Sequence, residues 1–179
     1  MSELVVFSYK HPDRAGEVLQ QLATLKRENI RKPLIGIEDA AVVVKSDDGK
    51  VKIRQTLESA MKGTQVISGG LWGVLIGFLL GGPLLGALAG LGIGAILGRQ
   101  IDIGIDNDFI ERLGNELAAG DSALFLLAKD TPVETLVEEL NIRGGRLFST
   151  SLSDEVAAAF TQAANDEQVA RALEQEQSY

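Results

Sequence analysis

Glycine recurs every fourth residue in the one long stretch of this chain that carries no charge. Between Lys62 and Arg99 there is no Asp, Glu, Lys or Arg. The glycines fall into two series: Gly69, Gly73, Gly77 and Gly81, then Gly82, Gly86, Gly90, Gly94 and Gly98. A spacing of four keeps each series on one face of a helix, where a second backbone can approach closely. Because the two series change phase at Gly81-Gly82-Pro83, where a turn is easiest, we predict a glycine-zipper helical hairpin.

The side chains of this hairpin require burial. Residues 66–98 include 17 large apolar side chains, and burying each stabilises by roughly 1.5–3 kcal/mol, or about 25–50 kcal/mol together. A whole domain is stable by only about 5–15 kcal/mol, so exposure to water is excluded. Each glycine also costs a helix in water roughly 1 kcal/mol relative to alanine. We expect the glycines of both series, Pro83, Trp72 and Phe78 to make the contacts that bury the hairpin.

Lipid and protein can both supply that burial. Each arm has about 15 residues, roughly 22 Å as a helix, against about 30 Å for the hydrocarbon core of a bilayer. We favour a membrane-embedded or re-entrant hairpin, because predicted strands on both sides keep its ends on one side of a membrane and Lys62 and Arg99 flank it. Three alternatives stay open: a soluble homo-oligomer with the hairpins packed in its core, an oligomeric pore, and a hairpin that forms the core of one monomer.

Apolar periodicity on either side of the hairpin predicts an α+β domain. The predicted elements are a strand at 4–7, a helix from Pro12 to Asn29, strands at 40–45 and 51–55, a helix from Asp108, a strand at 123–128, a helix from Pro132, a strand at 146–151 and a helical tail from Ser153. The first six match the ferredoxin-like plan β-α-β-β-α-β, followed by an extra α-β pair.

This plan divides the chain into four segments. Residues 1–62 and 100–153 are the two halves of the α+β domain, 63–99 the inserted hairpin and 154–179 a polar helical tail. There is also a weak internal echo, because a strand, a lysine, a proline and a helix follow one another at 4–25 and again at 124–140.

Charge is distributed unevenly along the chain, whose formal net charge is −8. Residues 1–62 carry a net charge of +2 and residues 99–179 a net charge of −10. Because phosphate binding needs a basic surface, we expect no nucleic-acid partner. The basic pairs Lys26-Arg27 and Arg31-Lys32 are typical of a helix C-terminus, where cations are favoured. The chain has no cysteine and its N-terminus lacks a secretory pattern, which favours a cytoplasmic location for the polar parts.

The residues that most often carry acid–base chemistry are poorly placed for it. His11 is the only histidine, and its position before Pro12 is typical of a solvated turn. Glu38 and Asp39 are adjacent in a predicted strand, so they point to opposite faces and form no carboxylate pair. We therefore predict no catalytic residue.

Ligand-binding patterns are equally weak. Asp102, Asp106, Asn107 and Asp108 lack the glycine and the distal glutamate of a calcium loop. Helix capping, with Asp108 as the predicted cap, accounts for Asp106 to Asp108. The glycines from Gly90 to Gly94 follow no predicted strand, which argues against a nucleotide loop. We expect a non-enzymatic protein with a scaffold or regulatory role and without metal, cofactor or small-molecule substrate.

Seven segments, taken in order, resemble a known family. They are Glu38 to Val44, Gly49 to Thr56, Gly70 to Gly77, Gly81 to Gly86, Gly104 to Ile110, Ser122 to Leu127 and Thr150 to Ser153. Over about residues 3 to 160 the chain resembles the bacterial family of predicted membrane proteins called domain of unknown function 1269. The resemblance implies membrane association and no assigned activity. We expect a hairpin that enters the bacterial inner membrane from the cytoplasmic side and self-associates, followed after Ala164 by a tail longer than the family leads us to expect.

Overall fold

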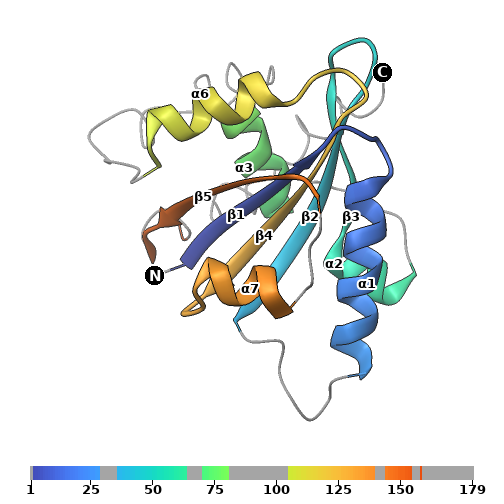
Figure 1. Ribbon diagram of the computed structural model, residues 1–179, viewed down its shortest axis with the longest axis vertical. Helices are drawn as coiled ribbons and strands as arrows, with labels where there is room; N and C mark the ends of the chain where they lie inside the picture. Colours follow the sequence, from blue (N-terminus) through green and yellow to red (C-terminus); the bar gives the residue numbers. More distant parts are fainter. Residues whose placement is uncertain are drawn as a thin grey trace.

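The computed structural model describes residues 2–28, 36–63, 70–80, 105–139, 144–154 and 158. Five strands form one antiparallel sheet in the order β3-β2-β4-β1-β5 (Figure 1). The strands are β1 (Ser2–Tyr9), β2 (Ile37–Lys45), β3 (Val51–Thr56), β4 (Ser122–Lys129) and β5 (Arg146–Leu152). The helices within the described residues are α1 (Arg14–Glu28), α2 (Leu57–Lys62), α3 (Gly70–Leu80), α6 (Asn107–Glu116) and α7 (Val133–Glu139). The prediction of an α+β fold is confirmed.

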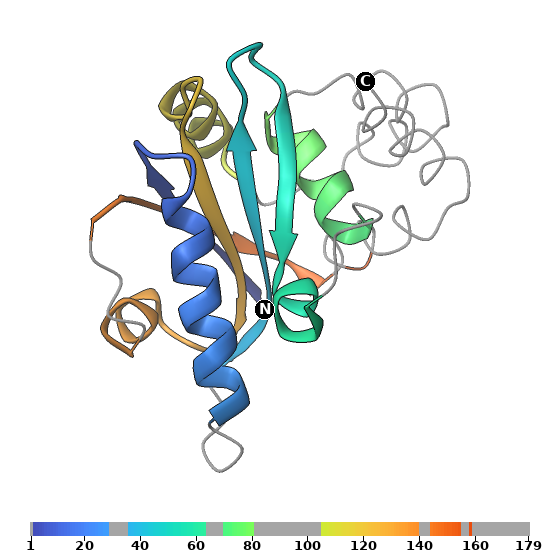
Figure 2. The ribbon, with the colours of Figure 1, turned by 90° about the vertical axis from the view of Figure 1, so that its right-hand side faces the viewer.

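Helices cover both faces of the sheet. Helices α1, α2 and α7 lie on one face, and α3 and α6 lie on the other (Figures 1 and 2). Successive residues of β1 alternate between the two cores: Val5 and Phe7 pack on the α1 side, and Leu4 and Val6 on the α3 side. Strands β1 and β4 are therefore apolar on both faces, which explains why their sequences show no polar alternation.

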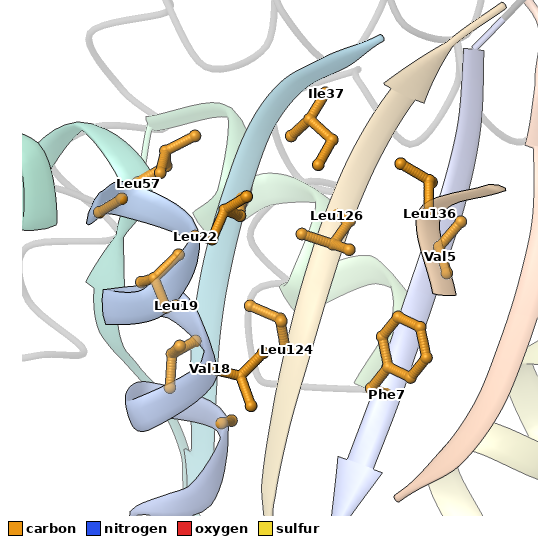
Figure 3. Close-up of a cluster of buried hydrophobic side chains, with 14 of the residues drawn as sticks. Val5, Phe7, Val18, Leu19, Leu22, Ile37, Leu57, Leu124, Leu126 and Leu136 are labelled. Carbon is orange, nitrogen blue, oxygen red and sulfur yellow. The ribbon is translucent and has the colours of Figure 1, made fainter. Parts of the chain in front are cut away.

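The core beneath α1 follows from the helical spacing of its apolar residues. Val18, Leu19 and Leu22 project from α1 toward Leu124 and Leu126 of β4 (Figure 3). Lys26 and Arg27 lie in the last turn of α1, as the dipole argument predicted. The second basic pair, at 31–32, lies outside the described residues.

The arrangement of β3 and α6 differs from the plan proposed from the sequence. A ferredoxin-like sheet made from the first six elements would pair β3 with β1 and place α1 and α6 on one face. In the structure β3 is an edge strand beside β2, and α6 packs on the face opposite α1. The physical reason is α3, which packs with α6 over the second face of the sheet and gives the apolar side of α6 a partner there. The cap of α6 also differs, because Asp106 and not Asp108 is the N-cap, its side chain accepting from the Asp108 N–H at 2.9 Å.

The internal echo in the sequence corresponds to two similar units. One is β1-α1-β2 and the other is β4-α7-β5, and α1 and α7 lie on the same face of the sheet. Strands β1 and β4 pair antiparallel at the centre, β2 lies outside β4 and β5 lies outside β1. The second strand of each unit therefore pairs with the first strand of the other unit: β2 with β4, and β5 with β1.

Candidate functional site

Helix α3, the described part of the glycine-rich stretch, is docked on the sheet by large apolar side chains. Trp72, Leu75, Ile76 and Leu79 follow the spacing i, i+3, i+4, i+7, which places them on one helix face. They and Val74 are at most 4% exposed and share one buried cluster with residues of β2 and β4. At roughly 1.5–3 kcal/mol for each of these five side chains, their burial stabilises by about 8–15 kcal/mol. Helix α3 is thus part of the domain core.

One hydrogen bond fixes this helix to β2. The indole Nε1 of Trp72 donates to Oδ2 of Asp39 at 2.8 Å, and Oδ1 of Asp39 accepts the backbone N–H of Ala40 at 2.8 Å. The Trp72 ring also meets the ring of Phe125 edge-on, with centroids 6.4 Å apart and planes at 68°. Because an indole N–H can only donate, a carboxylate is a well-matched partner at this position.

An irregularity in the backbone of β2 lies next to Asp39. The pairing of β2 with β4 changes register between Ile37 and Asp39, an irregularity of the kind that re-aims a side chain. Burial raises the pKa of Asp39, while the N–H of Ala40, the indole of Trp72 and the charge of Lys26 oppose the rise. The docking site therefore contains a half-buried carboxylate whose two oxygens are both used.

The glycines of α3 lie on a different flank from the docked side chains. Gly73 and Gly77 follow Trp72 and Ile76 by one position, which is about 100° around the helix. Gly73 is buried and Gly77 is half-buried, and Phe78 packs partly buried against the same cluster. The other predicted contact residues lie outside the described residues: Gly69, Gly81, Gly82, Pro83, Gly86, Gly90, Gly94 and Gly98.

A second polar feature, which the sequence analysis did not identify, is centred on Glu116 at the end of α6. Its carboxylate accepts from Ser8 Oγ at 3.2 Å and from Arg146 at 2.6 Å, and lies 3.3 Å from Nζ of Lys10. Lys10 also donates to Asp121 at 2.9 Å. These residues end or begin different elements, and they meet only because β1 lies between β4 and β5. Sequence spacing alone contains no indication of that order.

Two hollows flank the Glu116–Arg146 ion pair. One of about 630 Å³ lies between α6 and β5, and one of about 480 Å³ is lined by the C-terminal end of β1 and by the Gly144-Gly145 turn. Arg146 holds the pKa of Glu116 below its ordinary value, with Lys10 contributing. Burial raises the pKa of Tyr9 to about 12, and its hydroxyl has no hydrogen-bond partner. Glu116 thus stays ionised and Tyr9 stays protonated at neutral pH. Neither Glu116 nor Tyr9 is therefore poised to exchange a proton near neutral pH.

The remaining sequence candidates have ordinary environments. His11 is exposed in the turn before α1, where Nδ1 accepts the backbone N–H of Asp13 at 3.2 Å. Glu38 is exposed and accepts a 3.4 Å hydrogen bond from Ser2. No group of three or more His, Asp or Glu side chains in the described ranges is arranged to hold a metal ion, and Asp102 lies outside those ranges.

None of the helices in the described ranges combines the length and the apolar character needed to cross a bilayer. Helix α3 has 11 residues.

A family model described as "Protein of unknown function (DUF1269)" matches residues 66–165, more than half of the 179-residue chain. The chain belongs to the DUF1269 family. The DUF1269 match begins in the glycine-rich stretch and continues to the residues after β5, whereas the resemblance was expected from about residue 3. The residues of β1, α1, β2 and β3 precede it. No curated protein and no solved structure matches the chain.

Proposed function

We propose that this DUF1269 protein is a non-enzymatic scaffold or regulator that associates with the cytoplasmic side of a bacterial inner membrane and assembles with copies of itself. The observation that carries the proposal is the position of α3. It is docked on the sheet of its own domain, and the glycine-rich stretch continues beyond its last residue, Leu80, without a charge as far as Gly98. The α+β domain thereby holds one end of an apolar segment.

The segment that follows α3 needs a surface to cover it. Residues 81–98 contain seven large apolar side chains, whose burial is worth about 10–20 kcal/mol. The two faces of the sheet already carry helices, with α1, α2 and α7 on one and α3 and α6 on the other. Lipid supplies an apolar surface of the required extent, and this supports membrane association.

The same segment supports self-association. Gly82, Gly86, Gly90, Gly94 and Gly98 keep a spacing of four. In lipid, where apolar side chains gain nothing by leaving their surroundings, small residues favour helix pairing because they let two backbones approach closely. We propose that copies of the chain pack through this series.

We also propose that the two strand-helix-strand units form a ferredoxin-like core. The four strands β2, β4, β1 and β5 are neighbours and antiparallel, and α1 and α7 share a face, which supports this assignment. Elements β3, α2, α3 and α6 would then belong to one long insertion between the two units.

Native fractionation without detergent, followed by a carbonate wash of the membrane pellet, tests the proposal. We expect the full-length protein to stay in the washed pellet and to need detergent for release. Recovery in the supernatant as a large uniform particle would contradict membrane association and favour the soluble homo-oligomer.

A glycine substitution with a matched control tests the assembly. Gly90→Leu should reduce the oligomer size in detergent, because the leucine side chain keeps a second backbone away. Gly114→Leu is the control, since Gly114 is exposed on α6 and a Cβ there meets nothing within 4 Å. An unchanged oligomer in Gly90→Leu would contradict assembly through the glycine series.

A further inference from the structure

We infer that β5 is the strand through which two copies of this chain pair, antiparallel and edge to edge, so that their two five-stranded sheets become one. The inference rests on the proposed self-association and deepens it, because it names a contact between copies that uses the sheet and not the glycine series. The contact follows from the position of β5, from the contrast between the two edges of the sheet, and from the charges at the two ends of β5.

Strand β5 has an open side within the described residues. It lies at an edge of the sheet and pairs only with β1, in a register that runs from Ser2↔Leu152 to Ser8↔Arg146 without a shift (Figure 1). In an antiparallel sheet alternate residues direct both N–H and C=O to the same side, so three or four of the seven residues of β5 present these groups at the open edge. A regular edge of this kind is a template for another strand.

The internal similarity of the domain shows how an added strand would lie. Strands β2 and β5 are the second strands of the two similar units, and each pairs on its inner side with the first strand of the other unit. The outer side of β2 is covered by β3, which is antiparallel to it, whereas the outer side of β5 has no strand in the described part of the chain. A strand antiparallel to β5 would therefore do for the second unit what β3 does for the first.

The opposite edge of the sheet is protected against such pairing. Strand β3 carries the exposed side chains of Lys52 and Arg54, and a register shift in its pairing with β2 leaves Arg54 as an extra residue. Charges and bulges are devices that keep edge strands from pairing with other chains. Strand β5 has no register shift against β1, and its residues 147–152 are uncharged. Of the two edges, the β5 edge is the one suited to pairing.

The charges at the ends of β5 favour a second copy in the antiparallel direction. Arg146 begins the strand, and its side chain is 71% exposed although it pairs with Glu116. Asp154, two residues after the end of β5, is exposed as well. Parallel pairing of identical strands would bring like charges together, whereas antiparallel pairing brings Arg146 toward Asp154 of the second copy. A two-fold pair centred on Thr150 places these two residues opposite each other and uses the same surface on both copies.

The face of the sheet that carries α6 leaves room beside this edge. The hollow of about 630 Å³ lies between α6 and β5, and Arg112, Glu116 and Phe148 are among the residues that line it. The side chains of an added strand on this face can occupy the hollow without displacing α6.

Single cysteines can report which residues of two copies meet, because the chain contains no cysteine of its own. Ser149→Cys and Ser151→Cys change exposed side chains of β5, and a pair centred on Thr150 places position 149 of one copy opposite position 151 of the other. Lys52→Cys, on the charged β3 edge, is the control. The full-length variants are oxidised in a mild detergent, and disulfide-linked dimers are measured over time.

We expect an equal mixture of Ser149→Cys and Ser151→Cys to form dimers faster than either variant alone. The mixture should also be at least about tenfold faster than Lys52→Cys, because paired strands hold the two thiols together. A rate no greater than that of Lys52→Cys would overturn the inference. Dimers that form fastest from Ser149→Cys alone would overturn the pairing centred on Thr150.

Two charge variants at the same exposed sites test whether the strands face each other. In Ser149→Lys/Ser151→Lys each new lysine lies opposite a lysine of the second copy, and in Ser149→Lys/Ser151→Glu it lies opposite a glutamate. In the Gly90→Leu background, which weakens the proposed glycine contact, we expect light scattering in detergent to give a monomer for the first variant and a dimer for the second. Thermal unfolding followed by circular dichroism checks that both are folded. Equal masses of the two folded variants would overturn the inference.

The same measurements separate this inference from the proposed self-association. A parent protein that is monomeric in detergent and gives no excess of cross-linking would overturn both. A large parent oligomer without excess cross-linking would overturn the pairing of β5 alone. An oligomer of unchanged size in Gly90→Leu, with the cross-linking retained, would overturn assembly through the glycine series and support the pairing of β5.

Discussion

The indole Nε1 of Trp72 lies 2.8 Å from Oδ2 of Asp39, and this hydrogen bond joins α3 to β2 across 33 positions of sequence. The contact decides how the glycine-rich stretch divides. Its first part, α3, belongs to the core of an α+β domain. The uncharged residues 81–98 that follow it are the part for which we propose contact with lipid and with other copies.

Removing the Trp72 side chain should destabilise the domain strongly. Trp72→Ala loses the packing against Phe125 and leaves Oδ2 of Asp39 without its donor, and we expect a loss of about 3–5 kcal/mol in the free energy of unfolding. Trp72→Phe keeps a ring but loses the donor and should cost about 1–3 kcal/mol. Urea denaturation followed by circular dichroism measures both. Leu147→Ala, at a site that is 45% exposed, is the control and should stay within about 0.5 kcal/mol of the parent. A similarly small effect of Trp72→Ala would contradict the docking.

The titration of Asp39 should lower the free energy of unfolding as the pH rises. Burial raises the pKa of Asp39 in the folded protein above its ordinary value of 3.8. The folded state therefore holds this proton more tightly than the unfolded chain, so the contribution is fully present below pH 3.8 and is lost as the pH rises through the folded pKa. The stability of the parent minus that of Asp39→Asn should fall over this range in urea denaturation. A difference that is constant or rises with pH would show that the carboxylate is not buried as described.

Glu116 should show the opposite behaviour. Arg146 and Lys10 hold its pKa below the ordinary value of 4.5, so its contribution to stability is present above pH 4.5 and is lost as the pH falls through the folded pKa. Arg146→Ala should therefore raise the pKa of Glu116, measured by NMR titration of the side-chain carboxyl. Arg54→Ala is a suitable control, because Arg54 pairs with Asp13 and not with Glu116. An equal pKa of Glu116 in the parent and in Arg146→Ala would contradict the proposed ion pair.

Two glycines with similar backbones should respond differently to alanine. Gly145 and Gly49 have φ angles of +93° and +82°, a region in which a side chain is strained by about 1–2 kcal/mol. At Gly145 a Cβ would also lie 2.7 Å from Cε1 of Tyr9 and 2.9 Å from the carbonyl oxygen of Ser8, whereas at Gly49 it meets nothing within 4 Å. Gly145→Ala should thus lose about 1–3 kcal/mol more than Gly49→Ala in thermal or urea unfolding. Equal losses would mean that the turn does not press on Tyr9.

The sequence contained enough information for the elements of the fold but not for their arrangement. The apolar run of β1 and the helical spacing of Val18, Leu19 and Leu22 predicted a strand and a helix because those patterns are local. The face on which α6 packs depends on α3, and the edge position of β3 depends on β4 pairing with β2. Both are long-range choices that no local pattern specifies.

The candidate site likewise has one part that local sequence patterns predicted and one part that depends on long-range contacts. Trp72 was predicted to make a burial contact, but Asp39 was considered only as half of an unlikely acid–base pair. Its role as the acceptor of the indole N–H depends on a register change in β2 and on a partner 33 positions away. One local pattern did point to the docking. The apolar stripe of α3, formed by Trp72, Leu75, Ile76 and Leu79, is typical of a helix that packs on a sheet. The regular glycine spacing beside it instead predicted packing against a second helix.

Amide hydrogen exchange of the full-length protein tests most directly the claim that α3 is a fixed part of the domain core. We predict that the amides of Val74 to Leu79 exchange as slowly as those of β1 and β4, through global unfolding, both in detergent micelles and on vesicles. Fast exchange of α3 beside a protected sheet would contradict the account, because α3 would then be leaving the sheet while the rest of the domain stays folded.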